Sequence, residues 1–168
     1  QLYFLPLINL IEFQPKKNED VLRQFVPNKD YQEVLDRLLT KWQTARALVP
    51  EAAIEYSKFN NEAIISLGSC DGAVKEALDE LKEKNIGLNY CRVKAFPFTD
   101  AVREFIDKHE RVYVVEQNRD AQLRTLLMLD IDADPKKLIS VLHYNGLPIV
   151  ADFVIERVLE EAAKGRAA

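Results

Sequence analysis

Short apolar runs rich in β-branched residues alternate with helical apolar patterns from residue 63 onward. The runs are the predicted strands, and they cover residues 63–67, 88–96, 111–115 and 139–144. Apolar residues recur at helical spacing in the segments that follow them, at residues 73–84, 102–109, 123–127 and 153–163. Helices of about a dozen residues between strands indicate parallel pairing, because a helix can carry the chain back to where the next strand begins. The sequence therefore predicts an α/β fold with three layers: an open, mostly parallel sheet with helices on both faces.

The part of the chain before residue 58 has a different pattern. Prolines interrupt the apolar and polar stretches of residues 1–29 and prevent a long helix there. From Asp30, which can cap a helix, apolar residues recur at helical spacing up to Val49. We expect an N-terminal arm and a linking helix over residues 1–57, and the α/β domain over residues 58–168.

Composition narrows the classes of function. The formal net charge of -4 disfavours a surface that binds polyanions, so we expect no nucleic-acid partner. Two cysteines are too few for a disulfide framework and favour a cytoplasmic protein, and an iron–sulfur cluster would need about four thiolates. The two histidines fit no zinc pattern, so we predict no metal site.

Two further features are the length of the apolar stretches and the first residue of the chain. No stretch has the roughly 20 apolar residues that cross a bilayer, so we expect no membrane partner. The chain begins with Gln1 and its one methionine is Met128, which indicates a fragment or a subunit that starts elsewhere.

Three loops lie at the ends of predicted strands. They are Gly68-Ser69-Cys70-Asp71-Gly72, Phe96-Pro97-Phe98-Thr99 and Glu116-Gln117-Asn118-Arg119-Asp120. Ligands or partners of an open α/β sheet gather at the carboxyl ends of its strands. We therefore expect the three loops to lie along one edge of the sheet and to form its contact surface.

The first loop has two glycines at a strand-to-helix turn, where backbone N–H groups can bind a phosphate. It matches neither the G-x-G-x-x-G pattern nor a phosphate-binding loop with its lysine. A tight turn with a glycine at positive φ fits the residues better. Cys70 lies near the predicted helix N-terminus, where thiol pKa values fall, but no histidine follows in a motif, so we expect a buried small hydrophobic residue.

The third loop places three polar side chains directly after an apolar strand. Such groups are costly to bury unless they are paired. Glu116, Gln117 and Asn118 therefore either cap the next helix and tie the loops together or contact a neighbouring subunit, and the residues alone favour neither. Glu116 has no partner carboxylate or histidine nearby in sequence, which argues against acid–base catalysis. His109 ends a predicted helix, where a surface or capping role is expected.

Three motifs at these loops share the patterns of one protein family. Residues 68–77 match Gly-Ser-x-x-Gly-x-x-x-Glu-Ala, and Phe96-Pro97-Phe98 is similar to a Pro-Phe-Pro element. Residues 114–118 with Gln122-Leu123 are similar to V-V-E-x-N followed by G-Q-L, with Ala121 in the place of the glycine. Together they resemble the α subunits of 2-oxoacid:ferredoxin oxidoreductases.

Two flanking segments extend this resemblance to about residues 30–155. Residues 36–45 with Val49-Pro50 resemble the helix that follows the preceding domain, and residues 144–149 resemble a short closing segment. Both are closest to the 2-oxoglutarate branch of the family.

The resemblance implies a transketolase C-terminal-like domain within such an α subunit. These enzymes oxidatively decarboxylate a 2-oxoacid on thiamine diphosphate, pass electrons through iron–sulfur chemistry to ferredoxin and form an acyl-CoA. In the family this domain serves scaffolding and subunit contact. The resemblance therefore implies that the β subunit and the rest of the α subunit are partners, and that ferredoxin and CoA act on the full complex. Thiamine diphosphate, Mg and the iron–sulfur cluster are expected elsewhere in the complex.

We accordingly predict no catalytic residue and an isolated chain without activity. The predicted subunit-contact or loop-binding residues are Gly68, Ser69, Asp71, Gly72, Phe96, Pro97, Glu116, Gln117, Asn118 and Gln122. Two other functions stay open. One is a stand-alone transketolase C-terminal-like binding or regulatory module, and the other is a flavodoxin-like α/β module that binds a small molecule or nucleotide through the Gly68 loop.

Overall fold

A computed structural model describes residues 28–58 and 61–166 of the chain. The chain divides into two compact units, residues 1–44 and residues 45–168. An arm was predicted for residues 1–29, and residues 1–27 of it lie outside the described residues.

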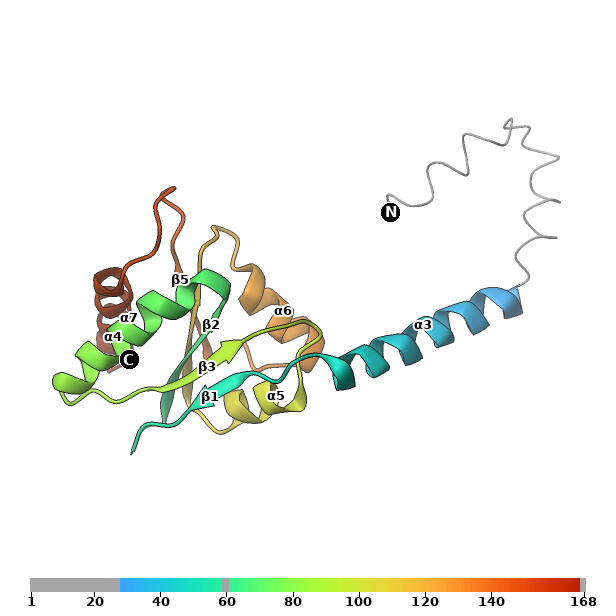
Figure 1. The fold of residues 1–168 in the computed structure, drawn as a ribbon, viewed down its shortest axis with the longest axis horizontal. Coiled ribbons are helices and arrows are strands. Elements are labelled where there is room, and N and C mark those ends of the chain that lie inside the picture. The colour runs from blue at the N-terminus through green and yellow to red at the C-terminus, as the bar shows by residue number, and fades with distance from the viewer. Residues whose placement is uncertain (1–27, 59–60, 167–168) are drawn as a thin grey trace. The chain divides into compact units, whose positions relative to one another are not determined.

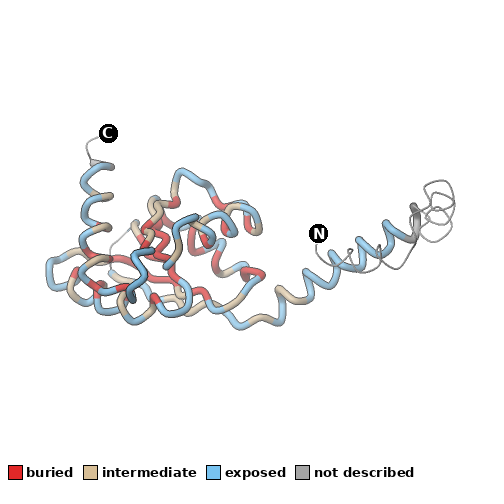
Figure 2. Tube along the Cα trace, turned by 90° about the horizontal axis from the view of Figure 1, so that it is seen from above, coloured by how far each residue is buried: buried red, intermediate tan, exposed pale blue. Residues whose placement is uncertain are grey.

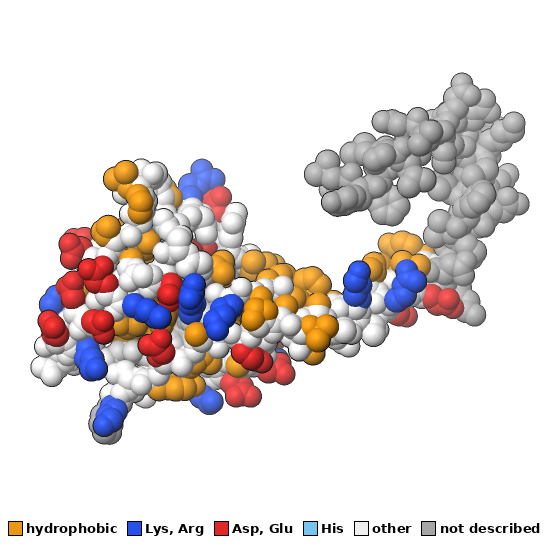
Figure 3. Space-filling view, in the orientation of Figure 1, with side chains coloured by type: hydrophobic (Ala, Val, Ile, Leu, Met, Phe, Trp, Pro, Cys, Tyr) orange, Lys and Arg blue, Asp and Glu red, His pale blue; other side chains and the backbone are white. Residues whose placement is uncertain are grey.

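The described part of the first unit is a helix, α3, which runs over Asn28–Leu48 and so extends into the second unit (Figure 1). The described helix begins at Asn28, which places the predicted cap Asp30 inside it. Leu35, Leu38, Leu39 and Trp42 belong to the predicted apolar stripe, and each is between 42% and 62% exposed. Figure 3 shows apolar side chains as orange atoms along α3.

The second unit contains a five-stranded sheet. Its strands are β1 (Ala53–Glu55), β2 (Glu62–Leu67), β3 (Asn89–Val93), β4 (Arg111–Glu116) and β5 (Leu138–Leu142). Their order is β1-β3-β2-β4-β5, and all pairs are parallel except β1 with β3. In the register of the sheet, Ile65 lies opposite both Cys91 and Val114. The predicted open, mostly parallel sheet is confirmed.

Helices cover both faces of this sheet. They are α4 (Asp71–Glu83), α5 (Asp100–Asp107), α6 (Gln122–Ile131) and α7 (Ala151–Arg166), and a 3₁₀ turn, η1 (Gly68–Cys70), precedes α4. Figure 1 shows α4 and α7 on one face and α5 and α6 on the other.

Alternating residues of the strands face the two helical layers. Ile64 packs with residues of α4 and α7, whereas Ala63 and Ile65 pack with residues of α5 and α6. Figure 2 shows the buried residues concentrated along the strands and the inner faces of the helices. Each fully buried aliphatic side chain contributes about 1.5–3 kcal/mol, so these two clusters supply the main stabilisation of the three layers.

One strand of the sheet was not predicted from the sequence. β1 has three residues, Ala53–Glu55, which is too short to show a period-two pattern. Its pairing with β3 makes residues 53–55 part of the α/β unit, whereas the predicted boundary at residues 57 and 58 assigned them to the linking segment. The strand predicted at residues 88–96 ends at Val93, before the loop that contains Phe96.

A buried polar network fixes the start of β3 against the end of α5. His109 is 3% exposed, so the predicted surface role is wrong, but its ring bonds the carbonyl oxygen of Phe105 and thereby caps α5. That oxygen can only accept, so Nδ1 of His109 donates and Nε2 accepts from Nδ2 of Asn89, 2.7 Å away. Oδ1 of Asn89 accepts the backbone N–H of Ser57 at 2.6 Å. The network therefore fixes the orientation of the His109 ring.

We expect Asn89→Ala to lower the free energy of unfolding by about 2 kcal/mol, because the buried ring of His109 and the half-buried backbone N–H of Ser57 lose their partner. Denaturant unfolding followed by circular dichroism measures this loss. Asn61→Ala is the matched control, since exposed Asn61 bonds exposed Glu110 and its loss changes stability by at most about 0.5 kcal/mol. Equal stabilities of the two variants would contradict the structural role of the network.

Candidate functional site

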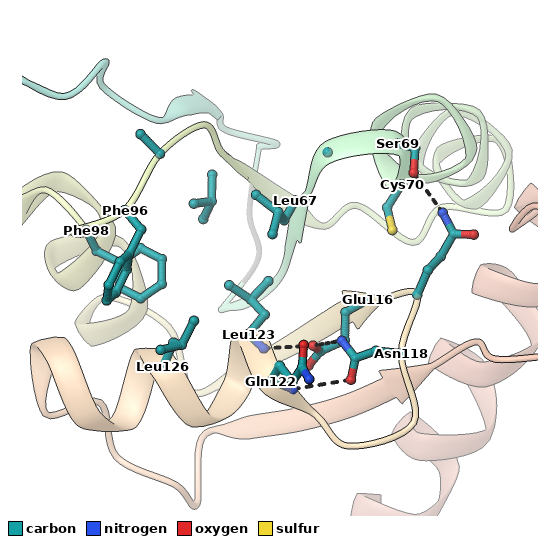
Figure 4. A pocket seen from close by; sticks show the side chains of 14 residues that line it. Leu67, Ser69, Cys70, Phe96, Phe98, Glu116, Asn118, Gln122, Leu123 and Leu126 are labelled. Carbon is teal, nitrogen blue, oxygen red and sulfur yellow. Dashed lines mark hydrogen bonds between the residues drawn. The ribbon is translucent and has the colours of Figure 1, made fainter. Parts of the chain in front are cut away.

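The three predicted loops meet at the carboxyl edge of the sheet around one pocket of about 420 Å³ (Figure 4). Its apolar side is formed by Leu67, Val93, Ala95, Phe96, Phe98, Leu123 and Leu126. Its polar side is formed by Gly68, Ser69, Cys70, Glu116, Gln117, Asn118 and Gln122. The parallel strands β2, β3 and β4 bring these loops together, because they end at the same edge of the sheet.

Seven of the ten predicted contact residues line this pocket, and three do not. The seven are Gly68, Ser69, Phe96, Glu116, Gln117, Asn118 and Gln122. Gly72 is exposed in the first turn of α4, and Pro97, which follows a cis peptide bond, is buried. Asp71 faces β3 instead, as described below. A role of these residues in subunit contact stays a prediction.

Apart from Phe96, the residues of the apolar wall were not among the predicted contact residues. Leu67 and Val93 are the last residues of β2 and β3, and their position next to the loops was the available signal. Leu126 lies within the predicted apolar stripe of residues 123–127, but it is 38% exposed while Leu123 and Leu127 are buried. Its side chain faces the pocket because its place on the helix is shifted from that of these two buried residues.

Glu116 ends β4 as a buried carboxylate, only 3% exposed. Its oxygens accept the backbone N–H groups of Leu123 at 2.7 Å and Arg124 at 3.3 Å, and the side-chain amide of Asn118. A carboxylate at this position satisfies N–H groups that have no partner within the helix and is favoured by the helix dipole. Glu116 is therefore an N-terminal cap of α6, supplied from the preceding strand.

The same loop is held by two further hydrogen-bonded side chains. Oδ1 of Asn118 accepts the backbone N–H groups of Asp120 at 3.0 Å and Gln122 at 3.3 Å. Gln117 donates from Nε2 to the hydroxyl of Ser69, 2.9 Å away, and so ties the third loop to the first. Asp120 does not cap α6, because its carboxylate pairs with Arg119 and the N-cap position belongs to Ala121.

Ala121 has a left-handed backbone conformation, with φ of 51° and ψ of 48°. This conformation brings Cβ close to the backbone in any residue except glycine. The turn between Asn118 and α6 thus accounts physically for the glycine that the family motif has at this position.

The first loop is closed by a polar network on β3. Gly68 has a φ of 64°, which confirms the predicted turn. Asp71 accepts a hydrogen bond from the hydroxyl of Tyr90 at 2.9 Å and pairs with Arg92 at 3.2 Å, and Tyr90 in turn contacts Ser66. Burial raises the pKa of Tyr90 well above its ordinary value, so its hydroxyl stays protonated.

The N-terminal turns of α4 and α6 already hold acidic side chains of this chain. Asp71 occupies the first turn of α4, and Glu116 caps α6. A phosphate at either helix would meet like charge, so the geometry argues against the predicted alternative of nucleotide binding at the Gly68 loop.

The two thiols are buried and not activated. Burial raises the pKa of Cys70 although hydrogen bonds with Gln117 act in the opposite direction, and burial raises the pKa of Cys91 to about 12. Within residues 28–58 and 61–166, no group of three His, Cys, Asp or Glu side chains could hold a metal ion. None of the helices in these same ranges has both the length and the apolar character that a membrane crossing requires.

Comparison with known proteins identifies relatives of this chain, although no protein-family model matches it. The 2-oxoacid:ferredoxin oxidoreductase subunit alpha of Saccharolobus solfataricus is 27% identical over 143 residues, which cover 82% of this chain and 22% of the relative. Subunit alpha of 2-oxoacid:ferredoxin oxidoreductase 2 of Aeropyrum pernix is 31% identical over 103 residues, which cover 58% of this chain and 16% of that protein. The chain is homologous to part of these α subunits. The resemblance seen in the motifs is thereby confirmed.

A solved structure shows the same fold. It is 2-oxoglutarate:ferredoxin oxidoreductase from Magnetococcus marinus with 2-oxoglutarate, coenzyme A and succinyl-CoA bound. The match has a TM-score of 0.71 and 21% identity, and it covers 82% of this chain and 24% of that chain. The chain thus spans less than a quarter of the length of each of these three proteins.

Replacement of Glu116 by alanine should lower the free energy of unfolding by about 2 kcal/mol, because the buried N–H of Leu123 and the half-buried N–H of Arg124 lose their acceptor. Glu116→Gln keeps one acceptor oxygen, so we expect a smaller loss. Urea unfolding of the two variants and the unsubstituted protein measures both effects. A midpoint and slope unchanged by Glu116→Ala would show that the carboxylate does not stabilise the helix.

Ala121→Gly should stabilise the protein by up to about 1 kcal/mol, because glycine adopts the left-handed conformation without a Cβ clash. The gain is limited by the greater freedom of glycine in the unfolded chain. Thermal unfolding is the measurement, and Ala101→Gly in α5 is the control, since glycine in a right-handed helix destabilises. Similar losses for both variants would contradict the role assigned to φ at Ala121.

Proposed function

We propose that this chain is the C-terminal domain of the α subunit of a 2-oxoglutarate:ferredoxin oxidoreductase. In that complex it serves as a scaffold and subunit contact for CoA-dependent oxidative decarboxylation. The observation that carries the proposal is homology to 2-oxoacid:ferredoxin oxidoreductase α subunits over 82% of the chain.

The geometry of the carboxyl edge supports scaffolding more than chemistry. A general acid or base must reach a reacting group, but the carboxylate of Glu116 is buried against the backbone of α6. Cys70 is a buried thiol whose pKa is raised, which disfavours the nucleophilic thiolate. The polar side chains of this edge thus stabilise the loops of the domain itself.

The choice of 2-oxoglutarate rests on two segments that resemble that branch of the family. One is the helix that contains Arg37 and Lys41, and the other is the turn at Asn145 and Gly146. In this turn, Oδ1 of Asn145 accepts the backbone N–H of Leu147 at 2.9 Å, and Gly146 has a φ of 85°. We assign the selection of the 2-oxoacid itself to other domains of the complex.

The proposed partners follow from the same assignment. The β subunit and the rest of the α subunit contact this domain, and they bind thiamine diphosphate, Mg and the iron–sulfur cluster. Ferredoxin and CoA act on the full complex, which we place in the cytoplasm.

We expect the tagged chain to co-purify with the β subunit and the remainder of the α subunit when the three are produced together. The chain alone should give no CoA-dependent reduction of ferredoxin with 2-oxoglutarate. Size-exclusion chromatography and a ferredoxin-reduction assay measure the two outcomes. Robust turnover by the chain alone would overturn the proposal, and a yellow colour or retained absorbance at about 260 nm would favour the flavodoxin-like alternative.

A further inference from the structure

We propose that the carboxyl-edge pocket docks an uncharged, apolar polypeptide segment of the partner subunit, and that none of the anionic reactants binds there. This inference rests on the proposed function, which supplies the partner subunit. It adds the chemistry of the contact and the residues that anchor it.

Three large apolar side chains line the pocket from different elements and remain exposed. Leu67 is 46% exposed, Phe96 is 43% exposed and Leu126 is 38% exposed. Single exposed apolar residues are ordinary, but three around one pocket form a patch that water solvates poorly. Aromatic and aliphatic groups without charge are typical of the centre of a protein–protein interface.

The apolar wall is held in place before any partner binds. The ring of Phe96 meets Phe98 edge-on, with centroids 5.1 Å apart, and the backbone N–H of Phe98 donates to Asp130 at 3.0 Å. Glu116 fixes the first turn of α6 and therefore the position of Leu126. A wall of this kind loses little conformational entropy on binding, which favours a specific contact.

The lining carries no cationic side chain. Its ionisable groups are Glu116 and Cys70, and no Lys or Arg is among the lining residues. A 2-oxoacid, thiamine diphosphate and CoA are all anions at neutral pH and would require a cation or a free helix N-terminus. The carboxylate of Glu116 occupies the N-terminus of α6, so an uncharged occupant fits this pocket better than any of these reactants.

The apolar surface continues beyond the pocket to the β5–α7 loop. A second hollow, lined by Tyr144, Leu147 and Pro148, shares Ser69 and Gln117 with the first. Tyr144 is 65% exposed and Leu147 is 67% exposed. The two hollows lie on either side of the Ser69–Gln117 hydrogen bond. An extended peptide segment can occupy both hollows at once, whereas a small molecule fits within one pocket.

The geometry also indicates how such a segment is held. One apolar side chain enters between Phe96 and Leu126, and a second contacts Leu147 across the Ser69–Gln117 bridge. Gln122 lines the pocket with an exposed side-chain amide, which can both donate to and accept from the backbone of the segment.

The test uses the full α subunit containing this domain, assembled with its β subunit. Leu126→Asp places a charge in the pocket, and Leu129→Asp is the matched control on the same helix, because Leu129 is 77% exposed and does not line the pocket. We expect Leu126→Asp to raise the dissociation constant of assembly at least tenfold, and Leu129→Asp to leave it unchanged. Leu147→Asp, in a different element, should act like Leu126→Asp if the surface is continuous. Thermal unfolding of each α variant shows whether folding is intact.

The outcomes separate this inference from the proposed function. If the unsubstituted α subunit assembles and both Leu126→Asp and Leu147→Asp assemble equally well, the inference is overturned and the proposed function stands. If the unsubstituted protein does not bind the β subunit, the proposed function fails, and the partner assigned here fails with it.

Hydrogen exchange of the α subunit alone tests the other occupants. Protection of residues 93–98 and 122–126 by 2-oxoglutarate, CoA or thiamine diphosphate would overturn the inference. Self-association of the α subunit that Leu126→Asp abolishes would assign the pocket to a second copy and would overturn it as well. Protection of these segments only when the β subunit is added is the expected result.

Discussion

The buried carboxylate of Glu116 is the interaction on which the carboxyl edge of this domain depends. Glu116 is the last residue of β4, and its carboxylate accepts the backbone N–H groups of Leu123 and Arg124 at the start of α6. These residues lie seven and eight positions further along the chain. A buried carboxylate is costly unless it is fully hydrogen-bonded, so the loop closes only in a conformation that meets this requirement. That conformation sets the place of Asn118, the left-handed turn at Ala121 and the apolar residues of α6 beside the sheet.

A second set of contacts completes the edge in the same way. Gln117 reaches the Ser69 hydroxyl, and Asp71 is held by Tyr90 and Arg92. The polar groups that could bind an ionic ligand are thus used within the domain, while apolar side chains remain exposed between them. This combination supports the proposed scaffolding role of the domain, for which homology to a limited part of the α subunits is the other support.

Much of the fold was predictable because it rests on local patterns. β4 is almost entirely β-forming residues and was found within one residue, and α4 shows its period through Val74, Ala77 and Leu81. The parts that were missed depend on distant partners. β1 is a strand because β3 lies beside it, and the buried ring of His109 pairs with Asn89, twenty residues away in the chain. Neither the β1–β3 pairing nor the His109–Asn89 hydrogen bond produces a periodic pattern in the sequence.

The sequence by itself determined the α/β alternation, the three loops at one edge and the family resemblance, because these follow from the order and spacing of residue types. It left the role of Glu116 and Asn118 open between capping and contact. The tertiary structure showed that both cap α6, since their acceptors and donors meet only after the chain turns at Ala121. It also decided that Leu126 faces the pocket beside Phe96, because the side of a helix that stays exposed is set by where the helix docks on the sheet.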